Sequence, residues 1–223
     1  ITTMGDIPAG TGLGSSSTVT VGVLNAMYAF QNKFVCPEDL AREACQIEID
    51  TLNIPSGYQD QYIAALGNFR LIEFEKDGKI TTQVIPLDPI VKNRLNENLL
   101  LFYTGQHRLS ESILTEQNNN VQDNLKILNK LKIMAHSAVE ELQKGDIDCI
   151  GYMLNESWQL KKRLASGITN GKIDYYYESA ISSGALGGKV TGAGGGGFLL
   201  IYCPYDKRDA VRTRLKELRE IPI

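Results

Sequence analysis

A loop rich in glycine and serine near the start of the sequence constrains the fold more than any other feature. Glycines stand at the alternate positions Gly10, Gly12 and Gly14, and Ser15 to Ser17 follow directly. Alternate glycines let a backbone take up positive φ and approach an anion closely. A helix that begins at the serines would add unpaired N–H groups and the positive end of its dipole. The pattern therefore predicts a phosphate site, with a serine-capped turn that binds nothing as the alternative.

Two other nucleotide-binding loops do not fit these residues. A Walker loop places a lysine after its last glycine, and no lysine follows Gly14. A dinucleotide fingerprint needs a third spaced glycine, and Ser15 stands at that position. The serine hydroxyls could ligate Mg²⁺ or donate to phosphate oxygens.

Hydrophobic periodicity and turn residues predict alternating helices and hairpins. The predicted helices cover residues 15–30, 38–50, 59–66, 110–144 as one helix or two, 147–164, 173–183 and 206–220, and the predicted strands cover 69–74, 79–85, 98–103, 189–191 and 198–203. The first helix rests on the helical spacing of Val19, Val23, Met27 and Phe30. Asp77-Gly78 predicts a tight hairpin. This mixture favours an α+β fold over a doubly wound parallel sheet.

Composition limits the class of protein. The chain has 223 residues, of which 43% are apolar and 22% charged, and a net charge of −3. These values are ordinary for a globular protein and argue against nucleic acid or a membrane as a partner. The four cysteines form no CxxC pair, which argues against a zinc site and fits reduced thiols in the cytoplasm. The first residue is Ile1, so we expect the natural N-terminus to be missing.

Two carboxylates downstream of the loop are candidates for chemistry. Glu48 could complete a Mg²⁺ site, and Asp60 could orient an acceptor hydroxyl and accept its proton. Glu43 and Asp50 lie close to Glu48 in the sequence and are alternatives to it. Solvated carboxylates at helix ends are the competing interpretation.

A second glycine loop precedes an apolar strand near the end of the chain. Four consecutive glycines, Gly194 to Gly197, lose much conformational entropy when they become ordered. We therefore expect this backbone to pack tightly against another loop or a ligand. A flexible hairpin connection is the alternative.

Both loops resemble motifs of the galactokinase, homoserine kinase, mevalonate kinase and phosphomevalonate kinase (GHMP) superfamily. Pro8 to Ser17 resembles PxxxGLGSSS, and Lys189 to Gly197 resembles KxxGAGGGG. The resemblance implies a two-domain α+β fold. Residues 1–89 would be the remainder of an N-terminal, ribosomal protein S5 domain 2-like domain that binds ATP, and residues 90–223 a ferredoxin-like C-terminal domain. Proline residues at 86 and 89 favour that boundary. The first motif of the superfamily is absent.

The resemblance also implies roles for individual residues. ATP would contact Pro8, Gly10, Gly12, Leu13, Gly14, Ser15, Ser16, Ser17, Gly192, Ala193, Gly194 and Gly195. Mg²⁺ would be held by Ser16 and Glu48, and Asp60 would be the catalytic base.

The acceptor implied by the resemblance is a sugar. Residues 57–62 resemble the sugar kinases, and residues 47–74, 99–117 and 158–198 resemble bacterial D-glycero-D-manno-heptose 7-phosphate kinases. The sugar phosphate would contact Gln61, Tyr103, Arg108 and Gly194, with Lys161, Lys162 and Arg163 as further candidates for its phosphate. L-fucose, galactose and mevalonate kinases, and a relative that binds sugar or nucleotide without catalysis, remain alternatives. A homodimer is one assembly that fits this family.

Overall fold

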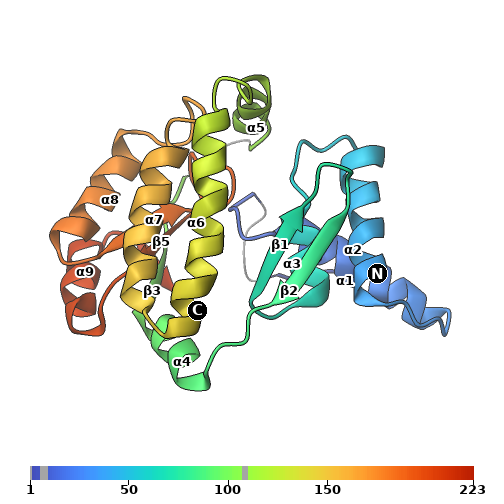
Figure 1. The fold of residues 1–223 in the computed structure, drawn as a ribbon, viewed down its shortest axis with the longest axis horizontal. Coiled ribbons are helices and arrows are strands. Elements are labelled where there is room, and N and C mark those ends of the chain that lie inside the picture. Colours follow the sequence, from blue (N-terminus) through green and yellow to red (C-terminus); the bar gives the residue numbers. More distant parts are fainter. Residues whose placement is uncertain (1, 6–9, 107–109) are drawn as a thin grey trace. The chain divides into compact units, whose positions relative to one another are not determined.

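The computed structural model describes residues 2–5, 10–106 and 110–223. They form two compact units, residues 1–84 and 85–223 (Figure 1). The boundary predicted at residue 90 falls just inside the second unit. Helices and hairpins alternate in both units, which confirms the predicted α+β class.

The first unit packs three helices and one hairpin. Its elements are α1 Ser15–Phe30, α2 Pro37–Cys45, the π-helical segment Gln46–Thr51, α3 Gln59–Leu66, β1 Arg70–Phe74 and β2 Ile80–Val84. Val21 and Leu24 of α1 pack with Leu40 and Ala44 of α2. On the other side of α2, Tyr62 joins a second cluster that the hairpin covers. These clusters hold the start of α1, the end of α2 and the start of α3 in fixed positions within the unit.

The apolar residues whose spacing predicts α1 do not lie on the face of that helix that packs against the core. Val19 and Met27 are about half exposed and Phe30 is 90% exposed, whereas Val21 and Leu24 are buried. The helix itself is confirmed, because its bounds match the prediction. Both faces of α1 carry apolar residues at helical spacing, so periodicity gives the helix but not the side that packs.

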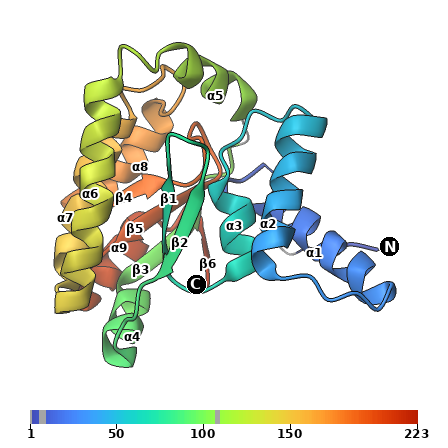
Figure 2. The same cartoon turned by 45° about the vertical axis from the view of Figure 1, so that its right-hand side comes forward.

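The second unit is built on a four-stranded antiparallel sheet of order β4-β5-β3-β6. The strands are β3 Leu99–Tyr103, β4 Gly187–Val190, β5 Phe198–Tyr202 and β6 Arg219–Ile221. The helices are α4 Pro89–Asn98, α5 Ser110–Asn119, α6 Leu125–Lys144, α7 Ile147–Lys161, α8 Gly171–Ser182 and α9 Arg208–Arg214, with a 3₁₀ turn at Tyr205–Lys207. Figure 2 shows α6 and α7 side by side along this sheet. Trp158, Tyr177 and Phe102 are fully buried in the core beneath them.

Two elements of the second unit differ from the prediction. Residues 89–97, for which the sequence pattern predicts no element, belong to α4, because Pro89 suits a first helical turn and the Asp88 carboxylate accepts a hydrogen bond from Ile90 N–H at 2.7 Å. The predicted closing helix ends at Arg214, and residues 219–221 pair with β3 as an edge strand. Charged residues suit an edge strand as well as a helix surface, so their pattern does not distinguish the two. Among the described residues, no helix has both the length and the apolar composition needed to cross a bilayer.

Candidate active site

The N-terminus of α1 has the geometry of an anion site. Gly10, Gly12 and Gly14 adopt φ values of +74°, +79° and +68°, which only glycine takes up without strain. Gly14 is the N-cap, no side chain of the described residues caps the helix, and no acidic residue stands in its first turn. The first N–H groups and the positive end of the helix dipole are therefore available to a negatively charged ligand. Pro8, which opens the predicted loop, lies outside the described residues.

Glu48 is the centre of a hydrogen-bond network that reaches this helix. The Ser16 hydroxyl donates to Glu48 Oε1 at 2.5 Å and the Thr20 hydroxyl donates to the same oxygen at 3.0 Å. The Ser17 hydroxyl donates to Glu48 Oε2 at 2.9 Å, and the Gln61 side-chain amide donates to that oxygen as well. Glu48 is only 2% exposed, so these donors replace the water that an exposed carboxylate would bind.

The donors keep Glu48 charged despite its burial. Burial acts to raise the pKa of this carboxyl, but the hydrogen bonds from the three hydroxyls and the amide outweigh it and hold the pKa below its usual range. The alternatives behave differently. Glu43 accepts a hydrogen bond from the Tyr28 hydroxyl at 2.7 Å, and Asp50 is exposed. Of the three carboxylates, Glu48 is the one hydrogen-bonded to Ser16.

An anionic carboxylate beside an exposed serine hydroxyl fits a magnesium ion. Mg²⁺ prefers hard oxygen ligands and is usually held by one or two carboxylates together with substrate phosphates. Ser16 is exposed at the start of α1, next to the turn suited to phosphate, while Glu48 lies directly behind it. Ser16 and Glu48 are thus the residues that would hold such an ion.

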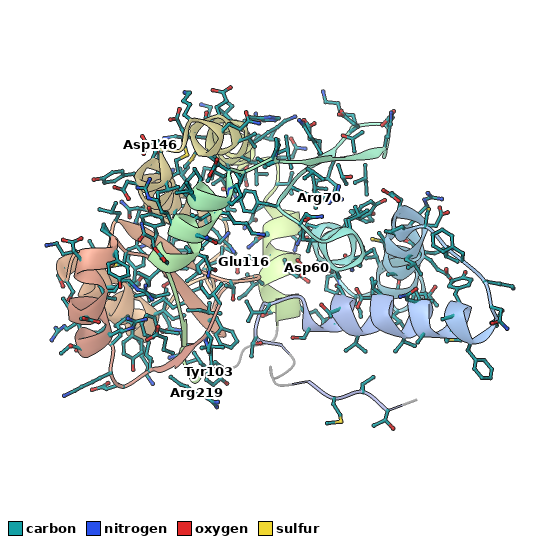
Figure 3. The ribbon with its side chains drawn as sticks, turned by 90° about the horizontal axis from the view of Figure 1, so that it is seen from below. Asp60, Arg70, Tyr103, Glu116, Asp146 and Arg219 are labelled. Carbon is teal, nitrogen blue, oxygen red and sulfur yellow. The ribbon has the colours of Figure 1, made fainter. Side chains whose placement is uncertain are left out.

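Asp60 lies against the glycine turn. It stands in the first turn of α3, where Figure 3 labels it. A Cβ atom built on Gly14 would lie 3.6 Å from Cβ and Cγ of Asp60 and 3.7 Å from its Oδ2. Burial, and then the negative charge of Glu48, raise the pKa of Asp60. A carboxyl group with a raised pKa beside an anion site is suited to accepting a proton.

The structure gives two predicted residues a different contact from the one expected. Gln61 is fully buried and its amide is committed to Glu48, so it positions that carboxylate rather than presenting its side chain to solvent. Ser17, predicted to face ATP, is 4% exposed and likewise donates to Glu48. Sequence reasoning missed Thr20 altogether. Its spacing of four residues from Ser16 places both hydroxyls on one helix face, which is the signal that could have found it.

The second glycine loop packs against its own unit. Gly195 N–H donates to the Ile168 carbonyl at 2.7 Å, and Gly197 N–H donates to the Gln106 carbonyl at 2.9 Å. A Cβ atom on Gly194 would come within 2.7 Å of the Ile168 carbonyl oxygen. The expected tight packing against other loops is therefore found. These backbone contacts exclude a flexible hairpin connection for the loop.

The remaining predicted residues of the second unit lie near that loop or the sheet. Tyr103 ends β3, where it pairs with Arg219, as labelled in Figure 3, and its ring lies 5.3 Å from the ring of Phe198. Gly192 accepts a hydrogen bond from the Lys161 ammonium. Ala193 packs against the core of the unit. Two of the cationic candidates for the sugar phosphate, Lys162 and Arg163, follow α7; Lys162 lies 3.6 Å from Asp174 and Arg163 is exposed. Arg108 lies outside the described residues.

Comparison with protein families assigns both parts of the chain. Residues 1–68 match the GHMP kinases N terminal domain, and residues 138–220 match the GHMP kinases C terminal domain. The first match includes the Gly10–Ser17 turn, Glu48 and Asp60. The second includes the glycine loop after β4.

Individual relatives agree with this assignment. The D-glycero-alpha-D-manno-heptose 7-phosphate kinase of Campylobacter jejuni is 30% identical over 218 residues, which are 96% of this chain and 64% of that protein. The bifunctional fucokinase/GDP-fucose pyrophosphorylase of Arabidopsis thaliana is 30% identical over an alignment of 230 positions, which covers 100% of this chain and 22% of that protein. The chain thus spans less than two thirds of the length of these relatives.

A solved structure shares the fold. The crystal structure of a D-glycero-D-manno-heptose 1-phosphate kinase from Bacteroides thetaiotaomicron matches with a TM-score of 0.78 and 26% identity, covering 97% of this chain and 61% of that one. The N-terminal domain match contains the first glycine motif and both carboxylates. The C-terminal domain match follows it in the sequence and contains the second glycine motif. This chain belongs to the GHMP kinase family, of which it carries the N- and C-terminal domains.

Proposed function

We propose that the protein transfers the γ-phosphoryl group of ATP to a hydroxyl of a phosphorylated sugar. The observation that carries this proposal is the position of Asp60, whose carboxyl group packs against the Gly14 turn at the head of α1. A proton acceptor and an anion site are thereby neighbours within one unit. Phosphoryl transfer needs little beyond such positioning and the neutralisation of charge.

Each residue of this site has a defined task in the proposed reaction. Asp60 accepts the proton of the acceptor hydroxyl. In the same step, the hydroxyl oxygen of the sugar bonds to the γ-phosphorus, and the bond between that phosphorus and the oxygen bridging it to the β-phosphate breaks, which releases ADP. The amides at the start of α1 would bind the terminal phosphates, and Ser16 and Glu48 would hold Mg²⁺. The ion neutralises charge on the phosphates when it is bound. Gln61, Ser17 and Thr20 fix the carboxylate of Glu48.

Heptose 7-phosphate is the acceptor we propose, with its C1 hydroxyl as the position that reacts. Support comes from the Campylobacter jejuni relative, which is named for the 7-phosphate. The structural neighbour is named for heptose 1-phosphate, so the two names differ in where the sugar carries phosphate. L-Fucose is the second candidate, because two proteins named as fucokinases are also 30% identical to this chain.

We further propose that the protein works in the cytoplasm and that residues 1–89 and 90–223 are its ATP-binding and C-terminal domains. Four cysteines without disulfides support a reducing compartment. A homodimer is the assembly we would test first.

The experiment is an ADP-release assay on the complete protein that contains this chain. Heptose 7-phosphate, heptose 1-phosphate, L-fucose, galactose and mevalonate are compared with MgATP at equal concentration. The proposal predicts the highest kcat/KM for heptose 7-phosphate, with the product phosphorylated at C1 as determined by ³¹P NMR.

Nucleotide binding is measured in parallel, so that two failures can be told apart. Binding of MgATP without ADP release on any of the acceptors would favour a relative that binds without catalysis. A preference for fucose or mevalonate would retain the kinase and overturn the proposed acceptor.

A further inference from the structure

A groove between α6 and α7 of the second unit has no part in the proposed reaction. It has a volume of about 350 Å³, within the range of small-molecule sites. Met134 and Ala138 line it from α6, and Met153 and Trp158 line it from α7. The two helices run side by side in Figures 1 and 2. Apart from Ser157 and two lysines, the described residues that line the groove are apolar, and none of them is acidic.

Two lysines give the groove one cationic end. Lys161, in the last turn of α7, and Lys189, in β4, both line it. Burial, and then the charge of Lys189, lower the pKa of Lys161 to about 7, and burial lowers the pKa of Lys189. In the described part of the chain, no carboxylate acts on the pKa of either lysine, and Lys161 donates to the Gly192 carbonyl. Burying two neighbouring lysines without an anion disfavours their charged forms, and a bound anion would favour them again.

The indole N–H of Trp158, a residue that lines the groove, lacks a hydrogen-bond partner within the described ranges. Trp158 is fully buried, and its indole N–H has no hydrogen-bond acceptor among the described residues. Buried indole N–H groups usually find one. An apolar body with two lysines at one end complements a ligand of the opposite design.

We propose that this groove binds an amphipathic anion, a short apolar chain with a carboxylate or phosphate head. The chain lies between α6 and α7 among the methionines and alanines, and the head lies between Lys161 and Lys189. Methionine side chains suit such a site, because they adapt to apolar ligands of different shape. Head groups of the two kinds share the same chemistry toward the lysines, namely charge-assisted hydrogen bonds.

The single tryptophan of the chain makes the test specific. Trp158 is the only tryptophan, so fluorescence excited where tyrosine does not absorb reports on this groove alone. Decanoate, decyl phosphate and decyltrimethylammonium are titrated below their micelle concentrations. The proposal predicts a saturable change in Trp158 emission with the two anions and none with the cation. The anion that binds more tightly assigns the head group.

Substitutions in the groove and a matched control complete the test. Lys189→Gln and Lys161→Gln should each weaken anion binding by about tenfold or more, the effect of losing one charge-assisted hydrogen bond. Lys132→Gln removes the same charge from an exposed position of α6 outside the groove and should leave the affinity unchanged. Two variants are used because Lys161 also donates a hydrogen bond to the Gly192 carbonyl, so its substitution could disturb the glycine loop. Equal binding of the anions and the cation, or equal affinities in all three variants, would overturn the proposal.

Discussion

At the scale of single residues, Glu48 and Asp60 are two carboxyl groups whose surroundings move their pKa values apart. Four donors surround Glu48 and hold its pKa down, whereas Asp60 has burial and a neighbouring negative charge that raise its pKa. Paired carboxyl groups with opposite shifts commonly divide two roles between them. Here the charged one suits a metal ion and the more basic one suits proton transfer.

Glu48→Gln should weaken the binding of Mg²⁺-nucleotide at least about tenfold and destabilise the fold by about 2 kcal/mol. The substitution removes the charge that the hydroxyls of Ser16, Ser17 and Thr20 are arranged to meet, and hydrogen bonds to charged groups are worth roughly 1.5–3 kcal/mol. Titration of nucleotide at varied Mg²⁺ and urea denaturation measure the two effects. Glu43→Gln is the matched control. If Glu43→Gln lost the Mg²⁺ dependence and Glu48→Gln kept it, Glu43 would be the magnesium ligand in place of Glu48.

Asp60→Asn should melt at a higher temperature than the wild type at neutral pH. Because the pKa of Asp60 is raised in the folded state, the folded chain binds the Asp60 proton more tightly than the unfolded chain does. Stability therefore falls as pH rises from the pKa of the unfolded state to that of the folded state. Asparagine removes this loss, and the difference should vanish below pH about 3, where aspartic acid is protonated in both states. Melting curves from acidic to neutral pH test it. Asp50→Asn, at an exposed position, is the control; equal melting of the two variants at neutral pH contradicts the account.

The sequence predicts residues of this site better than it predicts their contacts. Ser16, Glu48 and Asp60 can be found because motif order and spacing survive without coordinates. The commitment of Gln61 and Ser17 to Glu48 could not be found, since it depends on how α1, the π-helical segment and α3 pack. A widened helical turn has no simple periodicity in sequence, and here it carries Glu48.

At the scale of elements, the glycine loop after β4 shows why Gly194 and Gly196 cannot carry side chains. Carbonyl oxygens of neighbouring loops approach its backbone so closely that a methyl group would collide with them. A Cβ atom on Gly196 would lie 2.5 Å from the Gln106 carbonyl oxygen. The loop is therefore part of the packed interior of its unit.

Gly196→Ala should lower the free energy of unfolding by about 1–3 kcal/mol, the usual cost of overpacking. Gly171→Ala is the matched control, because a Cβ atom there meets nothing within 4 Å and the residue begins α8. The control should be neutral or stabilising by up to about 1 kcal/mol. Urea denaturation measures the free energy of unfolding of both variants. Equal values would show that the loop can accommodate a side chain at Gly196.

Elements with local signals are predicted with correct bounds, and elements defined by distant partners are not. The bounds of α1 and α3 are confirmed, and the Asp77-Gly78 turn joins β1 to β2 as expected. In contrast, β6 owes its conformation to pairing with β3, more than a hundred residues earlier, and to the ion pair of Arg212 with Glu220. Neither cause is visible in the local sequence.

At the scale of the whole molecule, the chain divides into two units that each have their own core. The second unit has a continuous cluster centred on Trp158 and Ile201, and α4 covers a further cluster with Leu95. A core of this kind is what an independently folding domain requires. The α+β class follows from the sequence. The first unit, however, ends five residues before the predicted end at residue 89, because α4 belongs to the second unit and its first turn contains one of the prolines that suggest a break.

Residues 85–223 alone should therefore fold and unfold cooperatively. A shorter chain of residues 99–223 lacks α4, exposes the cluster around Leu142 and Tyr202, and should melt at a lower temperature. Near-ultraviolet circular dichroism and thermal denaturation of both chains measure this. A non-cooperative transition for residues 85–223 would show that the second unit depends on the first.

The central claim is that Asp60 accepts a proton beside the phosphates bound at the head of α1, and one pair of variants tests it most directly. In the complete protein, kcat for the preferred sugar and Kd for MgATP are measured for Asp60→Asn and for Asp50→Asn. We predict that Asp60→Asn lowers kcat by about 100-fold or more while Kd changes by less than about threefold, and that Asp50→Asn leaves both values near those of the wild type. Turnover of Asp60→Asn at the wild-type rate would contradict the assignment.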